Sequence, residues 1–479
     1  MAAPRISMLD VADRDLIDER TLDVFEKVGV RFQSVKACKT LERAGCRVDH
    51  ADGTVRIPRE LVAWAVAQLR RDVSLAAREP SRDALLDGSR TYATIAGICP
   101  HIVDMQTGLY RAPSLEDLAD VTRIADALDA FGIVWYSVSP TASVSAKMTD
   151  LAATACMLAH TGKHVMGQVT RPEEVAYTLE VARLCGGGAS LSERPIFSAI
   201  YCPVAPLQHD GPAVEAAMAL AEQRVPIDIF SLALAGATSP VTLAGTILQT
   251  NCDVLSAVVL LQLVAPGCHL IYSANAGIMD MQTSRFAASS PETALMNVAQ
   301  IELAHSYGMP ALSVGFVPDA SDLGFRSGIE DMAFALPTRL ARPDIMTGLG
   351  TLEAGQAVSF PKMLLDAEIM GYLDRLLEGV VVDDHHLSAE AITGVGPGGH
   401  YLSLKDTRVR IRAGEHWLPH LLARVSYSER QRGVPSEVER ATEAVSSLLA
   451  EHVPTPLPAG AAERVAALLA EAERDLPDK

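Results

Sequence analysis

The sequence predicts an α/β fold in which eight parallel strands, each followed by a helix, close into a (β/α)8 TIM barrel. Eight short apolar runs recur about 30 to 43 residues apart. Most of the intervals between them carry the spacing of an amphipathic helix. The chain has 479 residues, of which 49% are hydrophobic, so it can bury a core of this size. A doubly wound open sheet is the alternative, and the number of strands favours the closed barrel.

Residues 1–90 are predicted to form an N-terminal α+β extension before the barrel. Apolar stripes at helical spacing alternate there with short extended runs, and an Asp-Gly pair marks a turn at residues 52–53. The expected elements are helices over 11–29, 34–44 and 59–71 and strands over 54–58 and 72–77.

The barrel itself, with C-terminal embellishments, is expected over residues 91–425. Its predicted strands lie near 92–98, 132–138, 164–169, 196–202, 226–232, 268–274, 310–316 and 344–350. Its clearest predicted helices cover 115–130, 147–159, 172–184 and 361–378. A C-terminal helical tail, residues 426–479, contains helices over 435–451 and 460–474 that a Pro-rich link separates. The surface helices and the apolar part of this tail suggest that the chain forms homo-oligomers.

The composition excludes several classes of partner. A formal net charge of −18 argues against nucleic acid, because phosphate binding needs a basic surface. The eight cysteines form no CxxC pair, which fits a reducing cytosol. The first residues contain no apolar segment typical of a signal peptide. The longest apolar run, residues 254–266, is too short to span a membrane, so we expect a cytoplasmic protein.

The functional site is predicted where the barrel strands end, because reactive groups of such barrels lie at the carboxyl ends of the strands. Asp319 and Glu353 follow the last two strands and are the candidate catalytic residues. The candidate substrate contacts are polar and aromatic residues at strand ends, namely Tyr136, Gln168, Tyr201, Phe230, Asn275, Phe316 and Arg326. The alternative for each of them is a structural role in the barrel.

Such a set of side chains suits a cationic ligand. Aromatic faces attract quaternary ammonium groups, and carboxylates add Coulomb attraction in a pocket with little water. A metal site is not predicted. His160 and His164 are four residues apart, but Gly162 ends the helix between them. Cys202 lies near His209, and we interpret it as a buried, inert thiol. No P-loop and no GxSxG motif is present.

Long phrases of the sequence resemble the trimethylamine methyltransferase superfamily. They include ERTLDVFEKVGVRF at 19–32, LERAGCRVD at 41–49, VRIPRELVAWAV at 55–66, SPVTLAGTILQTNCDVLSAVVLLQL at 239–263, SSPETAL at 289–295, LLDAEIMGYLDRLLEGV at 364–380 and GPGGHYL at 396–402. Members of this superfamily are α/β barrels that move a methyl group from a methylated amine to a corrinoid protein. The resemblance therefore implies cobalamin on a partner protein and no tightly bound cofactor in this chain.

The chain departs from the family at positions that bear on its substrate. It contains only standard residues, whereas the founding trimethylamine enzymes carry pyrrolysine. Ser321, Gly324 and Arg326 stand where members commonly have Lys, Asp and Gln, and Asp406 stands where His-Thr is typical. The resemblance thus implies a relative that acts on a quaternary amine such as glycine betaine. The alternatives are a demethylase that uses a folate or thiol acceptor and a non-catalytic betaine-binding member.

Overall fold

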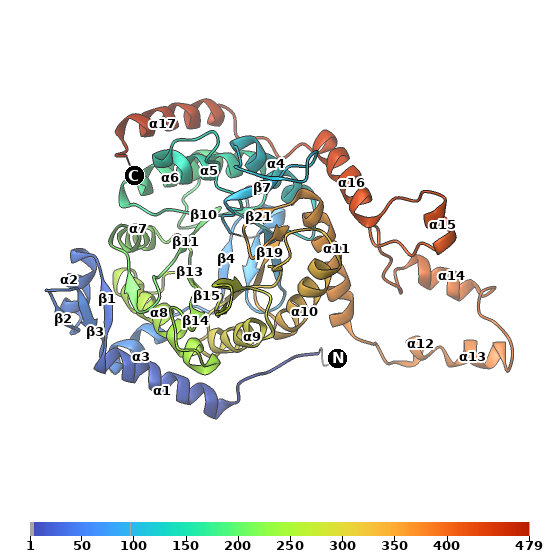
Figure 1. Cartoon of the computed structure of the whole chain (residues 1–479), viewed down its shortest axis with the longest axis horizontal. Coiled ribbons are helices and arrows are strands. Elements are labelled where there is room, and N and C mark those ends of the chain that lie inside the picture. The colour runs from blue at the N-terminus through green and yellow to red at the C-terminus, as the bar shows by residue number, and fades with distance from the viewer. Residues whose placement is uncertain (1–3, 96, 479) are drawn as a thin grey trace.

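The computed structural model describes residues 4–95 and 97–478, and it contains the predicted barrel (Figure 1). Eight parallel strands are hydrogen-bonded in the order β6-β19-β18-β15-β13-β11-β10-β9. A parallel bridge between Ala93 and Phe131 joins the first strand to the last, so the sheet closes. The strands are β6 (Tyr92–Ile95), β9 (Ile133–Trp135), β10 (His164–Gln168), β11 (Phe197–Tyr201), β13 (Ile227–Ser231), β15 (Leu270–Ala274), β18 (Ala311–Val314) and β19 (Ile345–Leu349).

One long helix follows each barrel strand and covers the outside of the sheet. These helices are α4 (Leu115–Ala127), α5 (Thr149–His160), α6 (Pro172–Cys185), α7 (Gly211–Glu222), α8 (Leu243–Val264), α9 (Pro291–Ser306), α10 (Phe325–Ala341) and α11 (Phe360–Glu378). Helix α8 is long and apolar enough to cross a membrane. Every residue from 250 to 262 is nevertheless buried inside the fold, so α8 is a core helix.

The N-terminal extension shares a sheet with the barrel. It contributes helices and strands that lie beside α7 and α8, and its strand β1 pairs in parallel with β12, which lies in the loop after β11. The Phe32 ring stacks on His209 of β12 at 4.3 Å between centroids. The elements are α1 (Val11–Lys27), β1 (Val30–Phe32), α2 (Val35–Arg43), β2 (Arg47–Asp49), β3 (Thr54–Arg56), α3 (Arg59–Ala67) and β12 (Gln208–His209).

A hairpin of the extension covers the amino-terminal end of the barrel. Strands β4 (Val73–Leu75) and β5 (Ala84–Leu86) form it, and β4 lies within the ring of strands in Figure 1. The carbonyl of Ala76 contacts Nδ1 of His164, the first residue of β10, at 2.9 Å. Among the described residues, this hairpin therefore covers one end of the barrel and leaves the other end open. Further short strands surround that opening: β7 (His101–Val103), β8 (Tyr110–Arg111), β14 (Leu234–Ala235), β16 (Gly277–Asp280), β17 (Arg285–Ala287), β20 (Thr351–Leu352) and β21 (Ala357–Val358).

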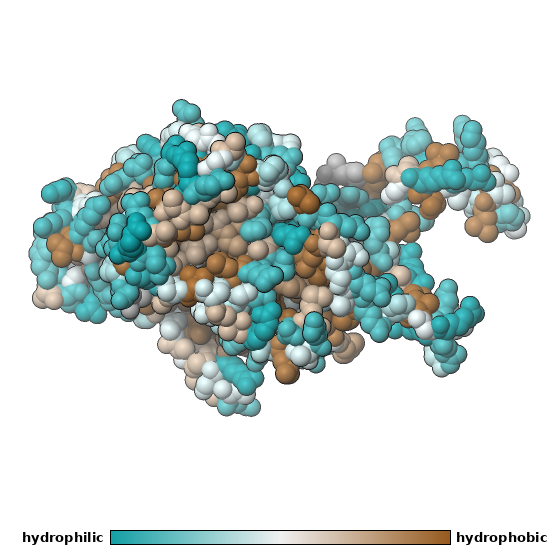
Figure 2. All heavy atoms as spheres, turned by 90° about the horizontal axis from the view of Figure 1, so that it is seen from above, coloured by the Kyte–Doolittle hydropathy of each residue, from teal (hydrophilic) through white to brown (hydrophobic). Residues whose placement is uncertain are grey.

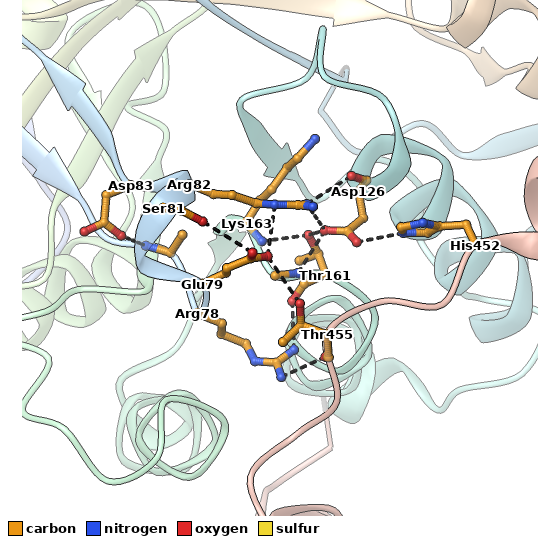
Figure 3. A network of polar contacts seen from close by, with 12 residues as sticks. Arg78, Glu79, Ser81, Arg82, Asp83, Asp126, Thr161, Lys163, His452 and Thr455 are labelled. Atoms are coloured by element: carbon orange, nitrogen blue, oxygen red, sulfur yellow. Dashed lines mark hydrogen bonds and ion pairs between the residues drawn. The ribbon is translucent and has the colours of Figure 1, made fainter.

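The chain leaves the barrel after α11, makes an exposed excursion, and returns as α16 (Glu437–Glu451) and α17 (Ala461–Asp475). Helix α16 packs on α11 and α4, and α17 packs on α6. A buried polar cluster holds the Pro-rich link between them (Figure 3). In it, Asp126 accepts hydrogen bonds from Thr161 Oγ1 at 2.7 Å and from Arg82 at 3.0 Å, and it contacts His452 at 2.8 Å. The N-terminal extension, the barrel and the C-terminal tail thus all contact the carboxylate of Asp126.

Candidate functional site

A cavity of about 350 Å³ lies at the open end of the barrel. Residues at or just after the carboxyl ends of all eight strands line it, together with the β20–β21 hairpin and Phe286 of β17. The lining residues are Gly97, Ile98, Trp135, Gln168, Ile200, Cys202, Phe230, Leu232, Asn275, Phe286, Val314, Val317, Thr347, Gly348, Ala354, Gly355 and Gln356. The position agrees with the expectation for a barrel enzyme.

Aromatic rings form one wall of this cavity. Trp135 at the end of β9 and Phe230 at the end of β13 meet edge to face, with ring centroids 5.8 Å apart. A Cβ on Gly97 would come within 3.0 Å of the Trp135 ring, so only glycine leaves room for the indole there. The indole N–H of Trp135 is buried and has no hydrogen-bond partner among the described residues. A buried donor without a partner is rare in folded proteins, which makes this N–H a candidate for contact with a ligand.

The polar groups of the cavity are neutral. Gln168, Asn275 and Gln356 contribute amides, and none of the described lining residues is charged. Cys202 also lines the cavity and is exposed, so the prediction of a buried residue is wrong, but desolvation by the surrounding protein raises the pKa of its thiol to about 12. It is consequently protonated at neutral pH and a poor nucleophile.

Charged side chains gather instead in a wider mouth above the cavity. This mouth encloses about 530 Å³ and shares Phe286, Ala354 and Gln356 with the cavity. Its charged lining residues are Asp280, Arg285, Asp319, Arg326 and Glu353. The sequence predicted one pocket of mixed carboxylates and aromatics. The structure separates an aromatic, amide-lined cavity from a charged mouth.

The two candidate catalytic carboxylates lie in the mouth and have different surroundings. Asp319 accepts hydrogen bonds from the Ala288 N–H at 2.8 Å and from Ser289 Oγ at 3.1 Å. It thereby ties the loop after β18 to the end of the β16–β17 hairpin. Glu353 lies in the β20–β21 hairpin, with a backbone φ of +49°. Arg326 is 2.6 Å from Glu330 and its side chain is 65% exposed, so it forms a surface ion pair at the rim.

The structure brings Gln168, Phe230 and Asn275 together in the cavity but places the other four predicted substrate contacts outside its lining, with Arg326 in the mouth. Tyr201 is bonded to His209 at 2.6 Å, and Tyr136 and Phe316 are fully buried. Along a strand, successive side chains point to opposite faces. The residues beside the predicted tyrosines therefore reach the cavity: Trp135 in place of Tyr136, and Ile200 and Cys202 in place of Tyr201.

One buried carboxylate lies below the cavity. Asp228 precedes Phe230 by two residues on β13, which places it on the same face and about 7 Å deeper in the barrel. One of its oxygens accepts a hydrogen bond from Ser273, and the other has no partner among the described residues. Burial raises the pKa of Asp228 to about 7, so its charge changes near neutral pH. Asp228 is not among the site residues predicted from the sequence.

A buried ion cluster supports the hairpin that lines both cavity and mouth. Lys362 at the start of α11 donates to Asp331 and Asp366, each at 2.7 Å. Asp366 also accepts the Gly350 N–H at 2.7 Å. Gly350 has a backbone φ of +89° and a Cβ there would meet Met363 at 2.5 Å, so glycine is required. The cluster thus holds the backbone immediately before the β20–β21 hairpin.

No group of three or more His, Cys, Asp or Glu side chains in the described part of the chain could hold a metal ion.

Comparison with known proteins agrees with the geometry. The family model described as trimethylamine methyltransferase (MTTB) matches residues 1–477. Trimethylamine methyltransferase MttB of Desulfitobacterium hafniense is 31% identical over 468 residues, which is 97% of this chain and 92% of that protein. Glycine betaine methyltransferase of Desulfitobacterium hafniense strain Y51 is 26% identical over 478 residues, with 99% of both proteins covered.

A solved structure, the hydroxylamine complex of MtmB, superposes with a TM-score of 0.52 at 12% identity over 92% of this chain and 93% of that one. This likeness supports the barrel fold. Family membership follows from the family model, which matches almost the whole sequence. The chain belongs to the trimethylamine methyltransferase family and is a methyltransferase.

Proposed function

We propose that the protein transfers a methyl group from a betaine, a quaternary amine that carries a carboxylate, to cobalamin held by a separate corrinoid protein. The unpartnered Trp135 N–H in an uncharged, amide-lined cavity carries this proposal. A carboxylate needs hydrogen-bond donors, and Trp135, Gln168 and Asn275 supply them without a buried positive charge. The similarity to a glycine betaine methyltransferase supports the same substrate class.

The arrangement of cavity and mouth orients such a substrate. With its carboxylate deep among the amides, the trimethylammonium group lies toward the mouth, near Phe286. A ring face attracts a quaternary ammonium group, and the carboxylates of Asp319 and Glu353 in the mouth add attraction. We assign these two residues to binding and orienting the cation. One methyl group then points outward, toward the mouth.

The reaction needs little proton chemistry from the protein. The C–N bond of the outward methyl breaks with its electron pair going to nitrogen, which leaves a neutral tertiary amine. A reduced corrinoid supplies the electron pair that forms the new bond to carbon. The cavity residues bind the substrate, align the methyl group and exclude water, so catalysis is by positioning.

The rim of the mouth suits a protein that covers it. Val241, Met281 and Phe325 are 72%, 68% and 87% exposed around this opening. Exposed apolar side chains that surround a site are typical of protein interaction surfaces. We propose that the corrinoid protein docks on them. The eight cysteines are all free thiols, which supports activity in the reducing cytoplasm.

The test is anaerobic turnover with cob(I)alamin and a panel of betaines, with trimethylamine alongside. We expect loss of the cob(I)alamin absorbance with at least one betaine and none with trimethylamine. Absence of methyl transfer from every betaine overturns the proposal. Turnover that needs a folate or a thiol in place of the corrinoid would establish a different acceptor. Tight betaine binding without turnover on any acceptor would establish a binding protein.

A further inference from the structure

A carboxylate is buried behind the wall of the cavity, on the outer side of the barrel strands. Hydrophilic side chains are spread over the face of the molecule in Figure 2, where water solvates them. Asp253 of α8 has instead no exposed surface. Its partners in the described structure are the Leu207 N–H at 3.0 Å, the Gln249 amide at 2.9 Å and the Ser231 hydroxyl at 3.2 Å. All three donors are neutral, and burial raises the pKa of Asp253 to about 7.

Ser231 connects this carboxylate to two residues that line the cavity. It ends β13 directly after Phe230, and its carbonyl accepts the Asn275 N–H at 3.0 Å. Phe230 and Asn275 both line the cavity. Successive side chains of a strand point to opposite faces, so the Ser231 hydroxyl points away from the cavity and reaches Asp253. The hydrogen bond to Asp253 thus holds the residue that lies between the aromatic ring and the amide.

The same turn of α8 also holds the end of β11. The Ser256 hydroxyl donates to the Asp253 carbonyl at 2.9 Å and lies 2.8 Å from Nε2 of His209. Since the Ser256 proton is donated to Asp253, Nε2 of His209 carries the ring proton and donates to Ser256. Nδ1 of His209 then accepts the Tyr201 hydroxyl at 2.6 Å, and burial, which lowers the pKa of His209 to about 3, keeps the ring neutral. Tyr201 directly precedes Cys202, so this chain of hydrogen bonds ends beside the cavity.

The N-terminal extension supports these groups from outside. The Leu207 carbonyl accepts the Arg31 N–H at 2.9 Å, and the His209 carbonyl accepts the Gln33 N–H at 3.0 Å. Phe32, between these two residues of the extension, stacks on His209. Leu207 and His209 both belong to the network around the buried carboxylate. The network therefore joins the extension to the ends of β11 and β13.

We propose that Asp253 is a positioning residue for methyl transfer, which holds the ends of β11 and β13 and so sets Phe230 and Asn275 against the substrate. The inference rests on the proposed function, because it takes the cavity as the betaine site. An apolar side chain in place of Asp253 would avoid the cost of burying a carboxylate, but it would leave the Ser231 hydroxyl and the Leu207 N–H without an acceptor. A shift of about 1 Å in a positioning group can lower a rate by about 100-fold. The buried carboxylate is thus explained by the geometry that it fixes.

Steady-state methyl transfer to cob(I)alamin, from the betaine that the wild-type protein turns over fastest, tests the inference in Asp253→Asn. The substitution keeps the shape of the side chain, but its amide nitrogen is a donor, so Ser231 or Leu207 loses its acceptor. We expect kcat to fall by about 10- to 100-fold. Betaine affinity, measured by isothermal titration calorimetry, should fall by at most about threefold, because the groups that bind the substrate remain. A residue that only stabilises the fold would leave kcat of the folded enzyme unchanged.

Ser231→Ala removes the donor that links Asp253 to the cavity and should lower kcat in the same way. Because both substitutions break one path, the double variant should be no slower than the slower single variant. Gln249→Ala is the matched control, since Gln249 donates to the same carboxylate from within α8 and does not line the cavity. It should leave kcat unchanged. Urea unfolding measures the stability of every variant.

Wild-type turnover separates a failure of this inference from a failure of the proposed function. Absence of wild-type turnover with every betaine overturns the proposed function and the inference with it. Wild-type turnover with an unchanged kcat in folded Asp253→Asn overturns the inference alone, as does an equal loss of kcat in Gln249→Ala. Losses that add up in the double variant overturn it as well, because they place the two residues on separate paths. If Asp253→Asn does not fold, Ser231→Ala decides, and a kcat equal to that of the wild type overturns the inference.

Discussion

The Trp135 indole and the Phe230 ring meet edge to face at 5.8 Å in the wall of the barrel cavity. The two residues end β9 and β13, which are separated by β10 and β11 in the sheet. The contact therefore spans the inside of the barrel and fixes the orientation of the indole. It leaves the indole N–H unpaired and its position constrained, which is the arrangement that a preorganised ligand contact requires.

Trp135→Phe tests the role of this N–H. The substitution keeps an aromatic ring and removes the donor. Betaine binding should weaken by about tenfold or more, because a hydrogen bond to a charged acceptor contributes about 1.5–3 kcal/mol. Choline, which has the same cation without a carboxylate, should lose little affinity. Trp64→Phe, in the extension, is the matched control. Equal losses for betaine and choline would contradict a contact to the carboxylate. Isothermal titration calorimetry measures both ligands.

Phe286→Leu tests the cation contact at the boundary of cavity and mouth. Loss of the ring face should weaken betaine and choline alike by roughly threefold to tenfold, since a cation–π contact contributes about 0.5–2 kcal/mol. Phe325→Leu serves as the control, because Phe325 is 87% exposed on the rim. Unchanged affinity for both ligands in the Phe286 variant would remove the ring from the site. The same titrations provide the measurement.

Asp228 should make betaine binding depend on pH. Its pKa is raised to about 7 by burial, so it is neutral below this pH and ionised above it. A substrate carboxylate about 7 Å away would then be repelled by about 2 kcal/mol at an effective dielectric constant of 20. Betaine affinity should therefore fall as the pH rises from 6 to 8. Asp228→Asn should abolish the change. An affinity that rises over this range would place the cation, not the carboxylate, at the deep end.

The Lys362 cluster should be essential for stability. Lys362→Met leaves Asp331 and Asp366 facing each other in the core, which should cost about 3–5 kcal/mol of unfolding free energy. The loss should be larger at pH 8 than at pH 5, because protonation of one carboxyl relieves the repulsion. Urea unfolding followed by circular dichroism measures it. Lys36→Met is the control, since Lys36 and Glu222 are both about half exposed. If Lys362→Met lowers the unfolding free energy as little as the control does, the Lys362 cluster is not essential for stability.

The sequence predicted the barrel well for a physical reason. Every barrel strand is covered on both faces, so each appears as a short continuous apolar run, and the spacing of the runs reveals the repeating unit. Because both faces of each strand are apolar, the sequence does not show which face a given residue occupies. Ile133, Val134 and Trp135 of β9 are all buried, so nothing in the pattern shows that Trp135 rather than Tyr136 reaches the cavity.

The remaining differences between the predicted and the observed site arise where tertiary contacts determine which residues line the cavity. Phe286 and Gln356 reach the cavity from hairpins beyond the strand ends, and strand spacing contains no information about such loops. Asp228 can be recognised in the sequence as a polar residue within an apolar strand. Its side chain lies in the layer of the barrel below the cavity. The exposed excursion after α11, residues 380–434, could not be distinguished from the barrel, because its apolar residues have no periodicity that predicts what covers them.

The central claim is that the cavity distinguishes a quaternary ammonium carboxylate from a carboxylate of the same shape that lacks the positive charge. Isothermal titration calorimetry of the wild-type protein with glycine betaine and with 3,3-dimethylbutanoate, its carbon isostere, tests this most directly. The two ligands share size and carboxylate and differ in the positive charge. We predict measurable betaine binding that is at least about tenfold tighter than binding of the isostere. Equal affinities, or binding of neither ligand, would contradict the account.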